Sequence, residues 1–379
     1  MNDERFFENA ISNHGSFDRI QKLFLRAEKG EKLNIAFFGG SITMGSLSST
    51  PEKCYAYHVY EWWCKTFPNA EFTYVNAGIG ATNSQFGCAR AESDLLKYEP
   101  DFVVVDFSVN DDSNEHFLET YEGVIRKIYY AKNNPAVLIL HNVYYNNGAN
   151  AQLMHAKVAR YYDIPAVSMQ SSIYSELLSG KIENREITPD DLHPNDAGHK
   201  LVASVITHTL EKMYDERKQD GKKEPEAGSR CKEKKKPFTE NAYENSIRYQ
   251  NDSKAAISDG FTVDKSQQKG ITDIFKNGWT AEKKGATIIF EVEGTCIGIQ
   301  YRKTVKLPAP VAEVVIDDEK EKAVVLDANF DETWGDKLQL DTIAEHMAGG
   351  KHKVQITLTE THKEDKLPFY LVSVIASGK

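Results

Sequence analysis

A serine, a histidine and an aspartate in this chain have the types and the placement that acyl transfer needs. Ser41 follows a short apolar run and two glycines, which predicts a position just past the carboxyl end of a buried strand. His193 lies far downstream, and Asp190 precedes it by three residues. Ester hydrolysis by a serine needs an imidazole as base and a third group that fixes the imidazole's tautomer. We therefore predict Ser41 as the nucleophile, His193 as the base and Asp190 as the orienting acid.

Simpler explanations stay open for the same residues. Ser41 could only cap a helix, as serines at strand-to-helix turns often do. Asp191 could orient the imidazole instead, although the three-residue spacing to His193 favours Asp190. Together with His199 these residues could also hold a metal, but no second ligand pattern accompanies them. We predict no metal and no cofactor.

Small-residue turns also offer donors for the oxyanion that forms during acyl transfer. The expected donors are the backbone N–H groups of Ser41 and Gly80 and the side-chain amide of Asn110. Gly78 is the alternative to Gly80, because both lie in one turn. Asn110 and Asp111 could instead only cap the helix that follows.

The elements that must position these residues alternate regularly between strand and helix. Apolar runs predict strands at residues 33–38, 72–75, 101–107, 136–140 and 165–168. Helical spacing of apolar residues predicts helices at 17–27, 54–67, 85–97, 117–131, 149–161 and 171–178, and a last helix ending near 214. This alternation predicts a parallel sheet with helices on both faces. The turns after the first three strands then lie along one edge, where their side chains can converge.

Four segments in this order resemble the motif blocks of the SGNH subgroup of GDSL-type hydrolases. The segments are residues 39–43, 76–82, 108–111 and 190–194. The resemblance implies a Ser–His–Asp esterase on a three-layer α/β/α fold, with serine, glycine and asparagine as oxyanion donors. Two positions depart from the family pattern: Gly40 stands where the family has aspartate, and Ser108 where it has glycine.

The second half of the chain has a different composition. Residues 215–237 are rich in charge and lack a hydrophobic face, which predicts a solvated linker. Alternating apolar residues then predict strands at 287–292, 296–301, 313–317, 353–358 and 369–374. We therefore expect an α/β esterase domain at 1–214, a linker at 215–237 and an all-β, jelly-roll-like sandwich at 238–379.

Composition excludes several classes of partner. The formal net charge of −10 argues against a nucleic-acid ligand, and no apolar run reaches the length of a membrane span. The five cysteines form no C-x-x-C pair, so we expect neither a disulfide framework nor a zinc knuckle. The polar first residues do not resemble a signal peptide, and we expect a cytoplasmic protein.

The combination of the two domains resembles bacterial carbohydrate esterases that deacetylate plant polysaccharides. More narrowly, it resembles the two-domain acetyl esterases of β-mannan oligosaccharides (carbohydrate esterase family seventeen). The resemblance implies removal of O-acetyl groups from acetylated oligosaccharides that enter the cell. We expect Trp334, in a loop of turn-forming residues, and Asp111 to bind substrate, and Trp279 to belong to the core.

Other functions stay open at this point. The enzyme could be an acetyl xylan esterase, or a lysophospholipase or thioesterase that prefers longer acyl chains. In a different class, an inactive SGNH domain could tether a lectin-like sandwich. The sandwich could cap its own chain's active site or that of a second copy, so a homo-oligomer is also open.

Overall fold

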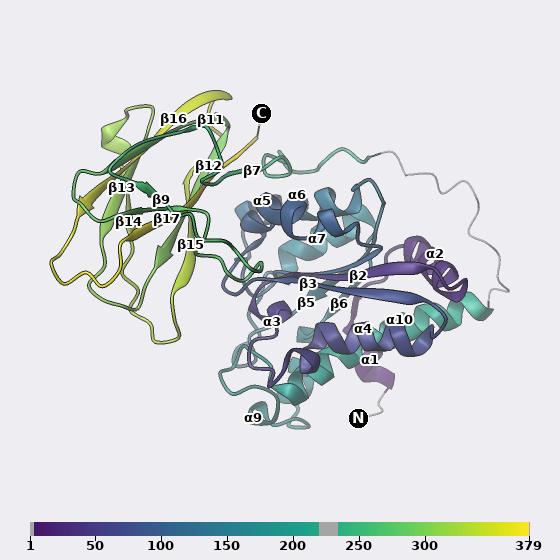
Figure 1. Cartoon of the computed structure of the whole chain (residues 1–379). Coiled ribbons are helices and arrows are strands. Elements are labelled where there is room, and N and C mark those ends of the chain that lie inside the picture. Colours follow the sequence, from purple (N-terminus) through teal and green to yellow (C-terminus); the bar gives the residue numbers. More distant parts are fainter. Residues whose placement is uncertain (1–3, 220–233, 379) are drawn as a thin grey trace. The chain divides into compact units, whose positions relative to one another are not determined.

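The computed structural model describes residues 4–219 and 234–378 of the chain. Its contacts divide into two compact units, Met1–Glu240 and Asn241–Lys379 (Figure 1). Within the described ranges, no helix is both long and apolar enough to cross a bilayer.

A six-stranded sheet forms the centre of the first unit. In spatial order its strands are β1 (Ile11–Asn13), β6 (Ala166–Ser168), β5 (Ala136–His141), β4 (Phe102–Asp106), β2 (Lys32–Gly39) and β3 (Glu71–Gly78). The five predicted strands pair in parallel, which confirms the predicted sheet. The edge strand β1 pairs antiparallel with β6 and was not predicted, because three half-buried residues carry no clear periodicity.

Helices cover both faces of this sheet. The first unit contains α1 (Glu4–Ala10), α2 (Asp18–Glu28), α3 (Ser41–Met44), α4 (Tyr55–Thr66), α5 (Ser84–Asp94), α6 (Glu115–Tyr129), α7 (Gln152–Tyr162), α8 (Ser175–Leu178), α9 (Asn184–Ile187) and α10 (Asp196–Gln219), with single turns η1 (Pro51–Lys53), η2 (Leu96–Tyr98) and η3 (Gln170–Tyr174). Helices α4 and α10 lie on one face, and α5, α6 and α7 lie on the other (Figure 1). The predicted three layers are therefore present. The segment expected as one helix at 171–178 is instead divided between η3, a π-type turn, and α8.

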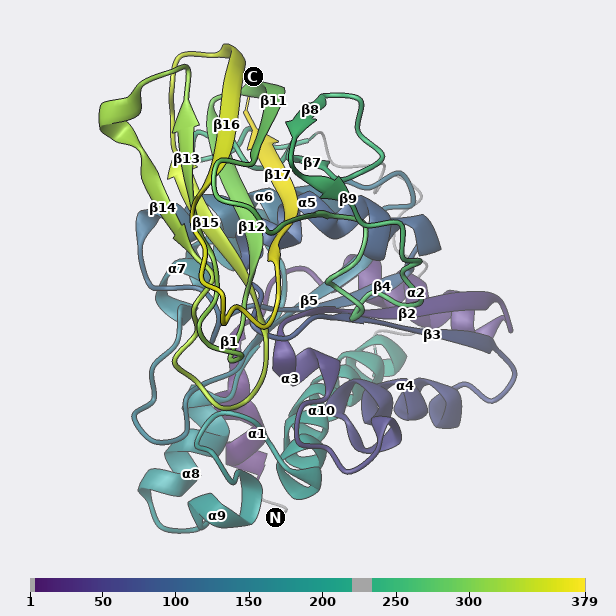
Figure 2. The same cartoon turned by 60° about the vertical axis from the view of Figure 1, so that its left-hand side comes forward.

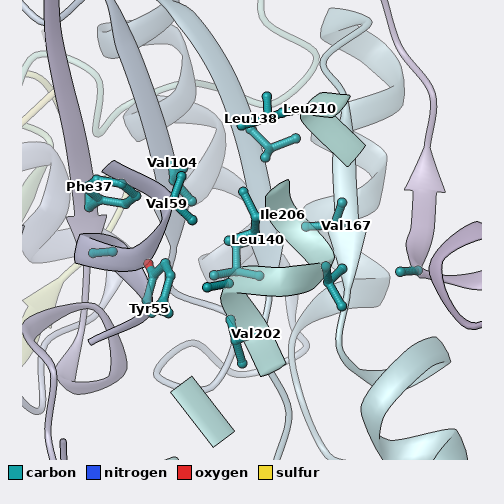
Figure 3. Close-up of a cluster of buried hydrophobic side chains, with 14 of the residues drawn as sticks. Phe37, Tyr55, Val59, Val104, Leu138, Leu140, Val167, Val202, Ile206 and Leu210 are labelled. Atoms are coloured by element: carbon teal, nitrogen blue, oxygen red, sulfur yellow. The ribbon is translucent and has the colours of Figure 1, made fainter. Parts of the chain in front are cut away.

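Aliphatic side chains hold α4 and α10 against the sheet. Strand residues from β2, β4, β5 and β6 meet Val59 of α4 and Val202, Ile206 and Leu210 of α10 (Figure 3). All of these α-helical side chains are fully buried. Burying one such side chain stabilises the fold by about 1.5–3 kcal/mol, so this layer fixes α10 firmly on the sheet.

The strand order places a topological switch at β2. The chain passes from β2 to β3 on one side and later to β4 on the other. Gly39, at the end of β2, is in register with Gly78 of β3 and with Asp106 of β4. The turns after these three strands therefore leave the sheet at one level, where open α/β sheets place their ligand sites.

The boundary between the two predicted domains needs correction. Helix α10 continues to Gln219, so residues 215–219 are helical rather than linker. Residues 220–233 of the predicted linker lie outside the described residues. The segment that follows packs on the first unit, where the N–H groups of Phe238 and Thr239 donate to the Glu122 carboxylate at 3.0 and 2.9 Å. These contacts extend the first unit to Glu240 rather than to 214.

The second unit is built from two antiparallel sheets that face each other (Figure 2). One sheet has the order β15 (Lys337–Ala344), β12 (Cys296–Lys303), β17 (Phe369–Ser377), β10 (Trp279–Ala281) and β9 (Thr262–Val263), with β7 (Ile247–Tyr249) paired to β17. The other has the order β14 (Val324–Asp327), β13 (Val311–Ile316), β16 (Gly350–Glu360), β11 (Thr287–Gly294) and β8 (Ala256–Asp259), and η4 (Lys320–Lys322) precedes β14. Trp279 packs edge-to-face on Phe290 between the sheets at 5.2 Å, which confirms its predicted place in the core.

Candidate active site

The structure joins the three predicted triad residues in one hydrogen-bonded chain. Ser41 Oγ lies 2.8 Å from His193 Nε2, and His193 Nδ1 lies 2.6 Å from Asp190 Oδ2. Ser41 is nearly buried, with 8% of its surface exposed. An acid at Nδ1 places the proton there and leaves Nε2 free to accept the serine proton. The arrangement is therefore that of a serine nucleophile with its base and orienting acid.

Asp190 also organises the loop that carries the histidine. Its Oδ1 accepts the backbone N–H groups of Leu192 and His193 at 3.0 and 2.7 Å. Partial burial opposes ionisation, but the hydrogen bonds from the His193 ring and from these two N–H groups together lower the pKa of Asp190 below its usual value. The carboxylate is thus ionised at neutral pH and able to hold the imidazole.

The neighbouring Asp191 has a different role. Its backbone is left-handed, with φ of 68°, and its side chain bonds Asn184 Nδ2 at 3.0 Å and the Arg185 guanidinium at 2.9 Å. It makes no bond to His193. Of the two acids, Asp190 is therefore the one that bonds the imidazole in this structure.

Ser41 is the first residue of α3 and does not cap it. The capping position is Gly40, and the Ser41 hydroxyl bonds His193. Both preceding glycines are required by close contacts: a Cβ on Gly39 would lie 2.3 Å from the Asp106 carbonyl oxygen, and one on Gly40 would lie 2.1 Å from Asn110 Oδ1. The family's aspartate at position 40 therefore has no space here, because Asn110 occupies it.

Two of the predicted oxyanion donors border the nucleophile. The Asn110 side chain packs on Gly40, and the cap of α6 is Asn114, so Asn110 is not a helix cap. A Cβ atom added to Gly80 would lie 3.9 Å from Ser41 Cβ, so this glycine is close to the nucleophile. The N–H of Gly78, by contrast, donates to Asn76 Oδ1 at 2.9 Å. The Gly78 N–H thus already has an acceptor, and Gly80 as oxyanion donor stays a prediction.

The metal alternative finds no support in the described part of the chain. Across residues 4–219 and 234–378, no three or more histidine, cysteine or acidic side chains form a group that could hold an ion. His199 accepts the Tyr55 N–H at Nδ1 and donates from Nε2 to the Ser46 carbonyl at 3.2 Å. Burial lowers the pKa of His199 to about 4, so it is a neutral core histidine.

Comparison with known proteins places this site in a family. Residues 37–201, which span all of the predicted catalytic positions, match the GDSL-like Lipase/Acylhydrolase family. Two crystal structures of a two-domain esterase (CEX) active on acetylated mannans, one of them co-crystallized with mannopentaose, are 62% identical to this chain. Each alignment covers 98% of both chains, with TM-scores of 0.93 and 0.94. The chain belongs to the GDSL-like acylhydrolase family. A search of curated proteins gave no significant match to this acylhydrolase.

The prediction that Asp111 binds substrate is wrong for this acylhydrolase. Asp111 is 6% exposed, and protein groups occupy both of its carboxylate oxygens. Oδ1 accepts the Ser84 N–H at 2.8 Å, and Oδ2 bonds His155 Nε2 at 2.9 Å. Its position beside Asn110 in the sequence suggested the substrate side, but the side chain points into the fold.

Trp334 of the acylhydrolase lies at the surface of the second unit. Its side chain is 59% exposed and meets only the edge of the Phe330 ring among the aromatic contacts of the described residues, at 5.1 Å. Binding of a sugar by Trp334 therefore stays a prediction, whereas a core role is excluded.

Sequence reasoning missed two buried ionisable side chains next to the acylhydrolase site. Asp106 is the last residue of β4, and 2% of its surface is exposed. Burial raises the pKa of this carboxyl to about 7, although the hydrogen bonds from Asn142 and Thr43 act to lower it. Arg90, on α5, is completely buried. A lone acid in an otherwise apolar strand was the available signal for Asp106. Arg90 gave none, because the carbonyls that accept its hydrogen bonds belong to Gly39 and Ala77, which are distant in sequence.

Proposed function

We propose that this acylhydrolase removes O-acetyl groups from acetylated β-mannan oligosaccharides through an acyl-enzyme on Ser41. The observation that carries the proposal is the continuous chain from Ser41 Oγ through His193 to Asp190, at 2.8 and 2.6 Å. The relative at 62% identity that is active on acetylated mannans supports the substrate class.

In the proposed mechanism, Ser41 Oγ attacks the acetyl carbonyl carbon while His193 Nε2 takes the hydroxyl proton. The oxyanion accepts hydrogen bonds from the N–H groups of Ser41 and Gly80 and from the Asn110 amide. His193 then returns its proton to the departing sugar oxygen, which leaves an acetyl ester on Ser41. A water molecule, deprotonated by His193, attacks this ester. His193 then returns that proton to Ser41 Oγ as the acetyl group leaves as acetic acid, which ionises to acetate.

We further propose that the second unit binds the oligosaccharide through Trp334. The exposed indole, braced by the Phe330 ring, is the kind of surface on which a sugar ring stacks. The co-crystal of the relative with mannopentaose supports an oligosaccharide as ligand. Trp334→Ala should raise KM for an acetylated oligosaccharide about tenfold and leave aryl acetate hydrolysis unchanged. An unchanged KM would reject this role.

The deciding experiment measures acetate release from acetylated mannan, acetylated xylan and an aryl acetate. We expect the mannan to be the best of the two polysaccharides, and Ser41→Ala to lose activity on all three by about 10³-fold or more. Equal rates on mannan and xylan would reject the mannan assignment. Folded Ser41→Ala with full activity would reject the mechanism.

An acyl-length series separates the lipid and thioester alternatives. Aryl acetate, butyrate and octanoate differ only in the acyl chain, so their kcat/KM values report how the site treats length. We expect the acetate to be hydrolysed fastest. A maximum at octanoate would favour a lysophospholipase or thioesterase instead.

We also propose that the protein works in the cytoplasm on imported oligosaccharides. Cys54, Cys64, Cys88 and Cys296 are free thiols, as is usual in a reducing compartment. Fractionation of the source cells with compartment markers tests this proposal, and recovery in the culture medium would reject it.

A further inference from the structure

The proposed oxyanion donors come from three separate turns. We call them the nucleophile turn (residues 40–45, after β2), the glycine turn (79–84, after β3) and the asparagine turn (107–114, after β4). We propose that Arg90 and Asp106 are positioning residues that set the distances among the donors by tying the nucleophile turn to the other two. The inference rests on the proposed function of Ser41, Gly80 and Asn110.

Arg90 joins the strands that lead into the nucleophile and glycine turns. Its Nη2 donates to the carbonyl of Gly39, the last residue of β2, at 2.9 Å. Its Nη1 donates to the carbonyl of Ala77 in β3 at 2.8 Å. The guanidinium lies 4.3 Å above the centre of the Phe38 ring and is fully buried. A planar fork can span two carbonyls in this way, whereas an ammonium group acts as a point charge.

The charge of Arg90 has an acidic neighbour on the same helix. Asp94, one helical turn along α5, is 3.5 Å away and offsets it. A buried ion pair is a weak source of stability, because desolvation offsets its attraction, and apolar residues of similar volume often stabilise as much. What the guanidinium supplies that an apolar side chain cannot is the two bonds that hold Gly39 and Ala77 together.

Asp106 joins the nucleophile turn to the asparagine turn. Its backbone carbonyl accepts the Gly40 N–H at 3.3 Å, and its Oδ2 accepts the Thr43 hydroxyl at 3.2 Å. Asn142, beyond the end of β5, donates to the same oxygen at 2.8 Å. Four residues after Asp106 the chain reaches Asn110, so the carboxyl group fixes the base of the turn that carries the amide.

A third link completes the set between the remaining two turns. The Asp111 carboxylate accepts the Ser84 N–H, which joins the asparagine turn to the glycine turn. Each pair of turns is therefore tied by one buried ionisable side chain. Loss of one oxyanion donor lowers kcat by about 10²–10³, and displacing a catalytic group by about 1 Å has a similar effect. Loosening one of these ties should therefore lower kcat.

The test compares Arg90→Lys and Asp106→Ala with two matched controls. Alanine removes the oxygen that accepts the Thr43 and Asn142 bonds, whereas the amide oxygen of an asparagine could still accept them. Arg126→Lys changes another buried arginine, which donates to the Tyr162 hydroxyl and to the Lys235 carbonyl. Glu122→Ala removes another buried carboxylate, which accepts the N–H groups of Phe238 and Thr239. The controls share the loss of a buried charge contact but touch none of the three turns.

We expect both test variants to lower kcat for an aryl acetate at least about tenfold, with KM changed less than about threefold. The controls should lower the melting temperature by a similar amount and keep kcat within about twofold of the unmodified protein. The rate at which a fluorophosphonate labels Ser41 should fall in parallel with kcat, because the tetrahedral adduct uses the same donors.

The proposal is overturned if either folded test variant loses less than about tenfold in kcat, or if the controls lose as much. Where Asp106→Ala does not fold, Thr43→Val removes the hydroxyl bond to the same carboxyl oxygen and leaves Asp106 in place. Where Arg90→Lys does not fold, Arg90→Gln replaces it. Ser41→Ala keeps the two questions apart: if unmodified protein and Ser41→Ala hydrolyse the ester alike, the proposed function has failed, whatever the positioning variants do.

Discussion

Adjacent acids in the loop before α10 face different partners, and the difference decides which one serves the site. Asp190 bonds the His193 ring and two N–H groups of its own loop. Asp191, with its left-handed backbone, turns its carboxylate to Asn184 and Arg185. The two neighbours are the same residue type, so residue type alone does not show which of them bonds the histidine.

Replacing each acid by its amide should separate their roles. Asp190→Asn offers an N–H to His193 Nδ1 and favours the wrong tautomer, so we expect kcat to fall by about 10³–10⁴. Asp191→Asn should lower kcat by no more than about threefold, because it acts on loop contacts only. Steady-state hydrolysis of an aryl acetate gives both values, and equal losses would contradict the assignment.

The buried carboxyl of Asp106 should give stability an unusual pH dependence. Its pKa is raised by burial to about 7 in the fold, against about 3.9 in an unfolded chain. Between about pH 4 and pH 7 the folded state therefore holds a proton that the unfolded state has lost, so this residue's contribution to stability falls as pH rises. Asp106→Asn does not titrate.

The melting temperature of Asp106→Asn relative to the unmodified protein should consequently rise from about pH 5 to about pH 8. Thermal unfolding at the two pH values measures this difference. A difference that is flat or falls with pH would show that the carboxyl is ionised throughout the range.

At the scale of elements, the site depends on how closely the turns approach one another. Gly40 allows the Asn110 amide to lie directly on the backbone that precedes Ser41. Gly40→Ala would put a methyl group 2.1 Å from Asn110 Oδ1, so the amide must move. We expect kcat to fall by about 10²–10³, the usual effect of losing one oxyanion donor.

The control for this change is Gly270→Ala, where a methyl group meets open space. Measured kcat for an aryl acetate should be unchanged in the control. Activity of Gly40→Ala within about threefold of the unmodified protein would show that Asn110 is not needed as a donor.

The helices and strands that could be predicted from the sequence are those whose buried residues recur with a clear period. The strands β4 and β5 are buried on both faces and appear in the sequence as continuous apolar runs. The amphipathic helices are buried on one face and show apolar residues at helical spacing. Short edge strands such as β1, β8 and β9 show no such pattern. The motif order predicted that Ser41, Asp190 and His193 would meet, whereas the inward turn of Asp111 and the bonds of Arg90 depend on tertiary packing that no local pattern contains.

For the whole molecule, the segment before the second unit acts as part of the first. Glu122 receives the N–H groups of Phe238 and Thr239, and Arg126 donates to the Lys235 carbonyl at 2.6 Å. A chain cut after residue 233 would remove these donors from the buried Glu122 carboxylate, which the Tyr162 hydroxyl also bonds. Each hydrogen bond lost from a charged group costs about 1.5–3 kcal/mol.

We therefore expect a chain of residues 1–240 to unfold at a clearly higher temperature than a chain of residues 1–233. The difference should exceed about 5 °C if the ties act as described. Thermal unfolding followed by circular dichroism measures it, and Glu122→Gln in the longer chain should remove most of the difference. Equal melting temperatures would show that the segment is only loosely attached.

The order of the catalytic groups along the chain has a consequence for synthesis. The ribosome makes Ser41 early, but the imidazole that activates it emerges only just before α10, the last helix of the first unit. A nascent chain can thus assemble most of the parallel sheet while its serine is still inert. Ester cleavage by ribosome-bound chains of increasing length should begin abruptly once α10 has left the exit tunnel, so activity itself would report the docking of that helix.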